Sequence, residues 1–204
     1  MVRETGPEDT TAEATPAERG RVRADARRNL DELLKAAMKV FASKGVDAPV
    51  RDIAKEAGVG VGTLYRHFPQ RSDLVLAVCT REIDACADAA ATFGDELQPF
   101  EAVSAWMNRY VQFIMTKRGL AAALYSGDPA YQGLPAYFEK RLHPALQGLL
   151  DAAEAAGAIR SGLKANELLR AVASFCAPAQ DVGPEYPARM LELFMDGLRY
   201  RAPA

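Results

Sequence analysis

The sequence predicts an all-α protein of 204 residues. Apolar residues recur every three or four positions through most of the chain, which is the spacing of an amphipathic helix. Glycine and proline interrupt this pattern at intervals that are typical of helix ends. Hydrophobic residues make up 49% of the chain and charged residues 25%, a balance that supports a large core and excludes global disorder.

The first segment, residues 1–22, is predicted to be a disordered tail. It is rich in Glu, Thr, Pro, Ala and Gly up to about Gly20 and offers little apolar surface to bury. Five arginines span the end of this tail and the start of the first helix: Arg19, Arg21, Arg23, Arg27 and Arg28. They form either a solvated helix face or a basic arm that reaches phosphates or a minor groove.

A wide apolar stripe predicts a first helix that ends at Gly45. The stripe consists of Leu30, Leu33, Leu34, Ala37, Met38, Phe41 and Ala42. We expect this helix to pack beneath the elements that follow it.

Two short helices joined by a tight turn are predicted over residues 49–68. The first has its apolar residues at helical spacing and stops at Gly58, since glycine adopts a positive φ without strain. The second runs from about Val61 to Phe68 and ends before Pro69, which cannot donate the next hydrogen bond.

The second short helix has two different faces. Val61, Leu64 and Phe68 share an apolar face, which we expect to be buried. Gly62, Thr63 and Arg66 lie on other faces of this helix. Small side chains, a hydroxyl and a guanidinium suit a close approach to base edges in the major groove of DNA.

The residues of this motif resemble the DNA-binding domain of the TetR family of bacterial repressors. The resemblance covers roughly residues 25–75 and rests on the ungapped string Ile-Ala-x-x-Ala-Gly-Val-x-x-Gly-Thr-Leu-Tyr-x-His-Phe, followed by Pro-x-Arg and Leu74. It departs from the family where Ala48 and Gly60 replace the Ser or Thr that commonly caps each short helix. A helical hairpin buried in another bundle is the alternative, but Thr, Tyr, Arg and His on an open face do not fit it.

The resemblance implies a three-helix head, an all-helical C-terminal core and a homodimer. The head is the helix-turn-helix DNA-binding domain at residues 23–71, and residues 72–204 form the effector-binding and dimerisation domain. Geometry and resemblance together assign the DNA contacts to seven residues: Arg51, Gly62, Thr63, Tyr65, Arg66, His67 and Arg71. Tyr65, His67 and Arg71 match phosphate-contacting positions of the family, whereas Arg66 contacts either a base or only solvent.

The charge distribution agrees with DNA binding by the head. The whole chain has a net charge of −2, but residues 19–81 carry thirteen Lys and Arg against seven acids. Residues 1–18 and 82–204 each have a net charge of −4. The positive charge therefore lies on the segment that would contact phosphates.

Residues 72–93 are predicted to form a long linking helix that breaks at Gly94 and Asp95, and further helices follow to the C-terminus. Aromatic residues with polar edges are candidates for a ligand pocket: Trp106, Tyr110, Phe113, Tyr125, Tyr137, Phe138, His143 and Phe175. Each could instead be ordinary core. We expect the effector to be lipophilic or aromatic.

The last helix is apolar on more than one face, which predicts a four-helix dimer interface formed with the preceding helix. Its candidate residues are Leu168, Val172, Phe175, Leu191, Phe194 and Leu198. In a dimer, two heads about 34–36 Å apart would read successive major grooves of a palindromic operator in double-stranded DNA.

Other classes of protein receive little support. We expect no enzyme, no cofactor and no metal site, because the chain lacks a Gly-rich phosphate loop, a nucleophile elbow and clustered metal ligands. A ligand-binding bundle without specific DNA binding remains the alternative function. The three cysteines, Cys79, Cys86 and Cys176, give no disulfide framework, which is typical of a reducing compartment. No apolar segment approaches the length of a membrane span. We therefore expect a cytoplasmic protein without a membrane partner.

Overall fold

The computed structural model of the chain describes residues 16–116, 120, 126–177 and 183–199, with side chains from residue 28 onward. All regular secondary structure among these residues is helical, as predicted. Tyr125, most of the predicted tail and part of the loop before the last helix lie outside the described residues.

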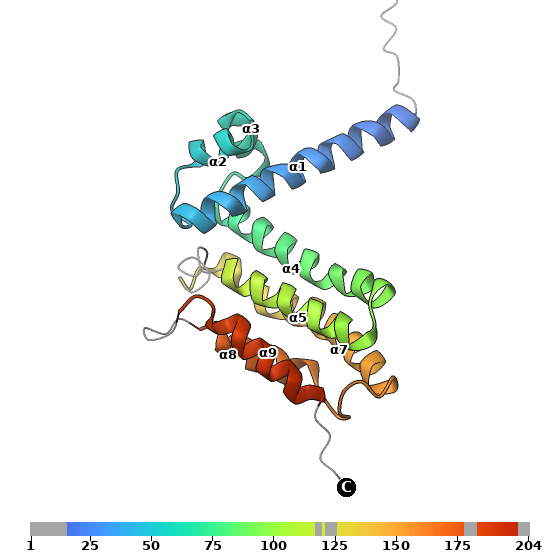
Figure 1. Cartoon of the computed structure of the whole chain (residues 1–204). Helices are drawn as coiled ribbons and strands as arrows, with labels where there is room; N and C mark the ends of the chain where they lie inside the picture. Colours follow the sequence, from blue (N-terminus) through green and yellow to red (C-terminus); the bar gives the residue numbers. More distant parts are fainter. Residues whose placement is uncertain (1–15, 117–119, 121–125, 178–182, 200–204) are drawn as a thin grey trace, which may run out of the picture.

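Three helices form a head at one end of the molecule (Figure 1). They are α1 (Pro16–Lys44), α2 (Val50–Glu56) and α3 (Val61–His67). The remaining helices form the core: α4 (Arg71–Glu96), α5 (Pro99–Thr116), the 3-10 helix η2 (Pro129–Tyr131), α7 (Leu134–Ala155), α8 (Ala165–Phe175) and α9 (Tyr186–Arg199). Helix α4 contacts α1 in the head and α5 and α7 in the core, which makes it the main link between the two parts.

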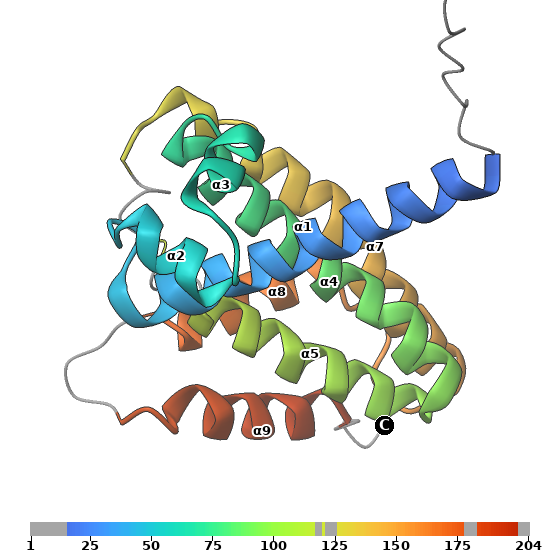
Figure 2. The same cartoon turned by 90° about the horizontal axis from the view of Figure 1, so that it is seen from above.

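Figures 1 and 2 show that the N-terminal half of α1 extends beyond the rest of the protein. This helix begins at Pro16, and residues 16–22 are therefore helical rather than part of a disordered tail. The reason lies in the local sequence, since proline is favoured at the first helical position and the Ala, Glu and Arg residues that follow are good helix formers. The low apolar content of residues 16–22 indicates that they bury little surface. They can still be helical, because they extend a helix whose later turns are packed against the protein.

Helix α4 also runs further than predicted, because it continues through Gly94 and Asp95 to Glu96. A Cβ atom at Gly94 would lie 3.5 Å from Cδ2 of Leu149, so the glycine sits in close contact with α7. Packing against α7 explains why this glycine lies within the helix and does not end it.

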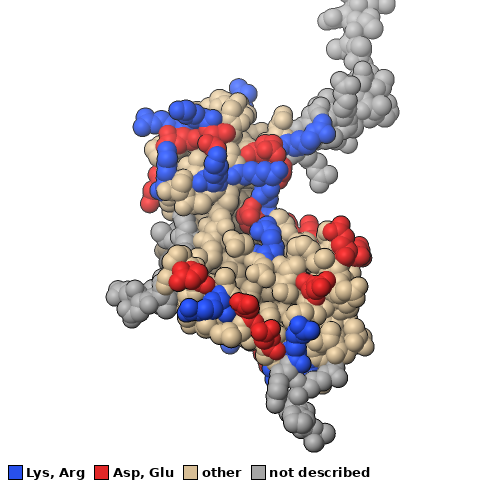
Figure 3. All heavy atoms as spheres, viewed as in Figure 1, with Lys and Arg blue, Asp and Glu red and all other residues tan. Residues whose placement is uncertain are grey.

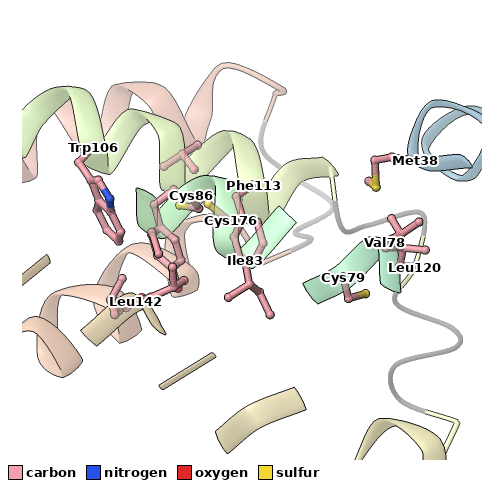
Figure 4. Packing of buried hydrophobic residues seen from close by; sticks show 14 of the residues in the cluster. Met38, Val78, Cys79, Ile83, Cys86, Trp106, Phe113, Leu120, Leu142 and Cys176 are labelled. Carbon is pink, nitrogen blue, oxygen red and sulfur yellow. The ribbon is translucent and has the colours of Figure 1, made fainter. Parts of the chain in front are cut away.

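A single hydrophobic cluster extends from the head into the core (Figure 4). In the head it includes Phe41 of α1, Ile53 of α2 and Leu64 of α3, each at most 1% exposed. In the core, Trp106 and Phe113 of α5 pack among residues of α4 and α7. All three cysteines are buried.

Candidate nucleic-acid interface and ligand core

The turn between α2 and α3 is fixed by the end of α2. Gly58 has a φ of +66°, its N–H donates to the carbonyl of Lys55 at 3.2 Å, and the N–H of Val59 donates to the carbonyl of Ala54 at 3.0 Å. This pair of bonds is a Schellman motif, which satisfies carbonyls at the end of the helix and reverses the chain. The glycine therefore turns the chain toward α3, as predicted from the sequence.

Two residues hold α3 on the head and leave its other face open. Leu64 is 1% exposed and Phe68, which caps the helix, is 8% exposed. The predicted base-contacting and phosphate-contacting residues on this helix are all exposed: Gly62, Thr63, Tyr65, Arg66 and His67. The structure thus brings five of the seven predicted contacts onto one short exposed helix.

Val61 differs from its prediction. The sequence pattern placed it on the buried face, but its side chain is 40% exposed at the start of α3. The reason is that Val61 is the first residue of the helix and lies one turn before the buried Leu64, beyond the edge of the packed surface. An exposed valine next to Gly62 can contact the methyl group of a thymine.

The charges on α2 are arranged so that the outer side stays positive. Its two acids, Asp52 and Glu56, pair with α1 through Lys44 at 2.9 Å and Lys39 at 2.5 Å. The hydrogen bond from Lys44 holds the pKa of the Asp52 carboxyl below its ordinary value.

Arg51 lies on the same helix with its side chain 81% exposed, and its Nε is 3.9 Å from Asp52. Lys55, one turn further on, is also exposed. We had not identified Lys55 from the sequence, although a basic residue four positions after Arg51 marks the same helix face. Figure 3 shows Lys and Arg side chains over the head and along α1.

Arg71, the last of the predicted DNA contacts, is the first residue of α4. It is half-buried, and its two terminal nitrogens donate to the carbonyls of Val46 and Ala48, the latter at 2.9 Å. These carbonyls belong to the segment between α1 and α2. Arg71 therefore fastens the start of α4 to the head, and its phosphate contact stays a prediction.

The predicted ligand-pocket residues fall into three groups. Trp106, Tyr110, Phe113 and Phe138 form one aromatic cluster, with ring centroids between 5.8 and 6.3 Å apart. Tyr137 lies outside this cluster and donates from its hydroxyl to Asp84 at 2.7 Å, which raises the pKa of Tyr137.

The third group lies elsewhere in the core. Phe175 packs edge-on against Phe194, with centroids 5.7 Å apart, at the contact of α8 with α9. His143 is half-buried on α7. The cluster around Trp106 is therefore the part of the prediction that the fold brings together.

Four of the six predicted dimer contacts are buried inside the protomer itself: Leu168, Val172, Leu191 and Leu198, each at most 4% exposed. They fasten α8 and α9 to the core, and little of their surface remains for contact with a second copy. Phe175 and Phe194 remain half-exposed, and Leu193 is 61% exposed. The sequence pattern identified apolar faces but could not say which of them the protomer covers.

A three-helix head with a helix-turn-helix, joined by one long helix to a helical core, defines a class of DNA-binding regulator. Comparison with known proteins identifies the family. Residues 33–78 match the family described as bacterial regulatory proteins, tetR family, and residues 98–200 match the C-terminal domain of SbtR-like transcriptional regulators. The chain belongs to the TetR family of transcriptional regulators.

Individual relatives agree with this assignment. A TetR transcriptional regulator from Streptomyces coelicolor is 37% identical, with a TM-score of 0.69 over 84% of this chain and 99% of the other. A TetR regulatory protein from Mycobacterium vanbaalenii is 33% identical, with a TM-score of 0.69 over 88% and 99% of the two chains. An HTH-type transcriptional regulator of Staphylococcus aureus is 31% identical over 109 residues, which span 52% of this chain and 59% of that protein.

Two features are absent from the described part of the chain. Within the described part of the chain, no group of three or more His, Cys, Asp or Glu side chains is placed to hold a metal ion. None of the helices in that part combines the length and the apolar content that crossing a bilayer requires.

Proposed function

We propose that the chain acts as a homodimer that binds a palindromic operator through α3 and is released from it by a small-molecule effector. The observation that carries this proposal is the exposed face of α3, where Gly62, Thr63 and Tyr65 project from a helix anchored by Leu64 and Phe68. A short helix with small residues near its N-terminus can enter the major groove, and its other side chains then reach bases and phosphates.

Individual contacts follow from position on the head. Thr63, the backbone of Gly62 and the side chain of Val61 would meet base edges, while Tyr65 and His67 would donate to phosphates. Arg51 and Lys55 would contact phosphates beside the groove. Arg66, also exposed, would contact either a phosphate or a base.

Dimerisation would use the outer faces of α8 and α9. Leu193, Phe194, Phe175 and Met190 are exposed or half-exposed there, and together they offer apolar surface that a second copy would cover. Two α8–α9 pairs related by a two-fold axis would form a four-helix interface.

Each function would belong to one of the two domains expected from the sequence. Residues 23–71 would bind DNA, and residues 72–204 would bind the effector and the second subunit. Helix α4 contacts α1 as well as α5 and α7, so a rearrangement of the core around an effector would move the head. A coupling free energy of about 1–3 kcal/mol would weaken operator binding about 5–150-fold.

The first test is selection of bound sequences from a random DNA pool, followed by titration of the best site at several salt concentrations. We expect a palindromic site, and a logarithmic salt dependence with a slope of about −0.9 for each phosphate contacted. Arg51→Ala should reduce the slope by about one contact, whereas Lys140→Ala, which removes a charge from an exposed position on α7, should leave it unchanged.

No enriched sequence, together with shallow non-specific binding, would refute specific operator recognition by the free protein. The alternative, a helical ligand-binding protein without specific DNA binding, would then account for the core. Addition of candidate effectors to the complex with the selected site tests release in the same assay.

A further inference from the structure

We propose that Trp106 anchors the effector site and that the effector is an uncharged, flat, mainly apolar molecule that carries a hydrogen-bond acceptor. This inference rests on the proposed function, since it assigns a ligand class to the core that would control the head. It follows from an unsatisfied donor, the arrangement of the rings around it, and the absence of buried charge among the described residues.

The indole N–H of Trp106 is a buried donor without an acceptor. The side chain is 0% exposed, and Nε1 is the one buried side-chain nitrogen or oxygen atom of the described residues that has no hydrogen-bond partner. Figure 4 shows this ring inside the apolar cluster, in the same region as Leu142 and Phe113. Buried donors are almost always paired, because leaving one unpaired costs its full desolvation penalty.

A neighbouring hydroxyl is only weakly paired. Tyr110, one turn along α5, donates to the carbonyl of Leu169 at 3.4 Å, which is at the long end of the hydrogen-bonding range. Burial raises the pKa of this phenol, so it stays protonated and available as a donor. The cluster therefore presents two donors on one face of α5 and lacks a strong acceptor for either of them among the described residues.

The rings around these donors favour a flat ligand. Trp106 and Tyr110 are nearly parallel, with an interplanar angle of 13°, and Phe113 lies at 24° to Tyr110. Phe138 of α7 faces Phe113 at 27°. A planar molecule inserted among these rings would stack on them, in the offset arrangement that aromatic side chains prefer.

Entry of such a molecule requires the rings of α5 and α7 to move apart. Both helices pack on α4, which reaches the head. A ligand that binds only the opened core would therefore favour a different position of α4. The ligand that pairs with the indole would thus bind the opened core more tightly than the closed core, and this difference in affinity is what release from DNA requires.

The ligand is expected to be uncharged, because the core offers no buried counter-ion among the described residues. No charged side chain among the described residues is buried. Several charged groups on α4, α5 and α7 are paired with one another, since Arg141 binds Asp84 and Asp88, each at 2.6 Å, and Arg109 lies 3.9 Å from Glu82. An ionised ligand would lose its hydration without gaining a counter-ion, which is strongly unfavourable.

The test uses the single tryptophan of the chain. Its indole N–H gives one cross-peak in a proton–nitrogen correlation spectrum of the full-length protein, and the position of this peak reports on hydrogen bonding. Three probes are titrated: acetophenone, ethylbenzene, which replaces the carbonyl by a methylene group, and benzoate, which carries a charge. Titration of the wild-type protein requires no mutation and is therefore independent of any folding defect.

We expect acetophenone to shift the indole proton downfield and to bind about tenfold more tightly than ethylbenzene. Benzoate should not bind in the core. Trp106→Phe should reduce the preference for acetophenone over ethylbenzene, whereas Tyr186→Phe, which removes a donor from an aromatic residue on α9, should keep it unchanged.

Several results would overturn the assignment. The first is equal affinity for acetophenone and ethylbenzene in the wild-type protein. The second is an indole peak that does not respond to millimolar acetophenone. The third is tighter binding of benzoate than of the other two probes. An internal water that permanently satisfies the indole would give the first or second of these results. Operator binding by the same protein before ligand is added separates the two proposals, because its absence would refute the proposed function and leave the indole titration unaffected.

Discussion

Asp31 of α1 accepts a hydrogen bond of 2.5 Å from Nε of Arg81 on α4, although the two residues are fifty positions apart in the chain. The same arginine also pairs with Glu82, whose second oxygen lies 3.9 Å from Arg109 on α5. Lys35 reaches Asp31 from the other side at 2.9 Å. This series of ion pairs joins the head to the core beside a hollow of about 620 Å³ between α1 and α4.

Asp31→Asn tests this link through its dependence on pH. The hydrogen bond from Arg81, with a smaller effect of Lys35, holds the pKa of Asp31 below its ordinary value of 3.8. Because the pKa is lower in the folded state than in the unfolded state, the stabilisation is present above about pH 4 and is lost as the pH falls through the folded-state pKa.

At pH 7 we expect Asp31→Asn to lower the free energy of unfolding by at most about 1 kcal/mol, since the aspartate side chain is 44% exposed. The difference from the wild type should shrink as the pH falls toward 3, as measured by urea denaturation. Glu32→Gln, which removes a more exposed carboxylate that pairs with Lys35, is the control. If the difference in free energy of unfolding between Asp31→Asn and the wild type stayed constant with pH, the ion pair would not be its cause.

Gly62→Ala should separate stability from DNA binding. A Cβ at this position would meet no atom within 4 Å, and the residue lies within α3. Alanine should therefore stabilise the protein by about 0.4–1 kcal/mol, because it reduces the freedom of the unfolded chain. If the backbone of Gly62 approaches a base edge closely, the added methyl group should weaken operator binding by about 1–3 kcal/mol.

Thermal unfolding and operator titration of Gly62→Ala test both halves of this prediction. Gly148→Ala, at an open position on α7, should raise stability without changing the affinity for the operator. Unchanged operator affinity in Gly62→Ala would show that α3 does not approach the bases at this point.

Arg71→Ala should destabilise the protein by about 1.5–3 kcal/mol, the usual contribution of hydrogen bonds from a charged group. Its guanidinium binds the carbonyls of Val46 and Ala48 and holds the chain between α1 and α2. The exposed Arg66→Ala should leave the free energy of unfolding unchanged within about 0.5 kcal/mol. Denaturant unfolding of both variants distinguishes the two roles.

Salt titrations complete the comparison of Arg71 with Arg66. Under conditions where Arg71→Ala is folded, its operator binding should keep the salt slope of the wild type if the guanidinium stays bound to the two carbonyls in the complex. A slope reduced by about one contact would show that Arg71 also contacts a phosphate.

Leu193→Glu should prevent dimerisation. Leu193 is 61% exposed on α9, beside the half-exposed Phe194, and a carboxylate buried against a second copy would be unpaired. Sedimentation should find a monomer at concentrations where the wild type is a dimer, and the operator should be bound more weakly. Ala188→Glu adds the same charge at an exposed position of α9 that faces α5, and should leave the dimer intact.

The sequence by itself determined the helical class and the DNA-binding helix, because both depend on local rules. Glycine at positive φ ends α2 at Gly58, and the spacing of Leu64 and Phe68 decides which face of α3 is buried. Such patterns act within one or two turns of a helix, so residue spacing alone is enough to detect them. The exposure of Gly62, Thr63, Tyr65, Arg66 and His67 could be predicted for the same reason.

Only the tertiary structure decided which of several apolar faces the protomer covers and which charges find partners. Leu191 and Leu198 have the same spacing as a dimer face, yet the core buries them and leaves Leu193 outside. Arg71 and Arg81 resemble other basic residues of the head in sequence, and each acquires its role from atoms more than twenty positions away. The unpaired indole of Trp106 likewise exists only once α4, α5 and α7 have packed, because burial and partnership depend on contacts between residues far apart in the chain.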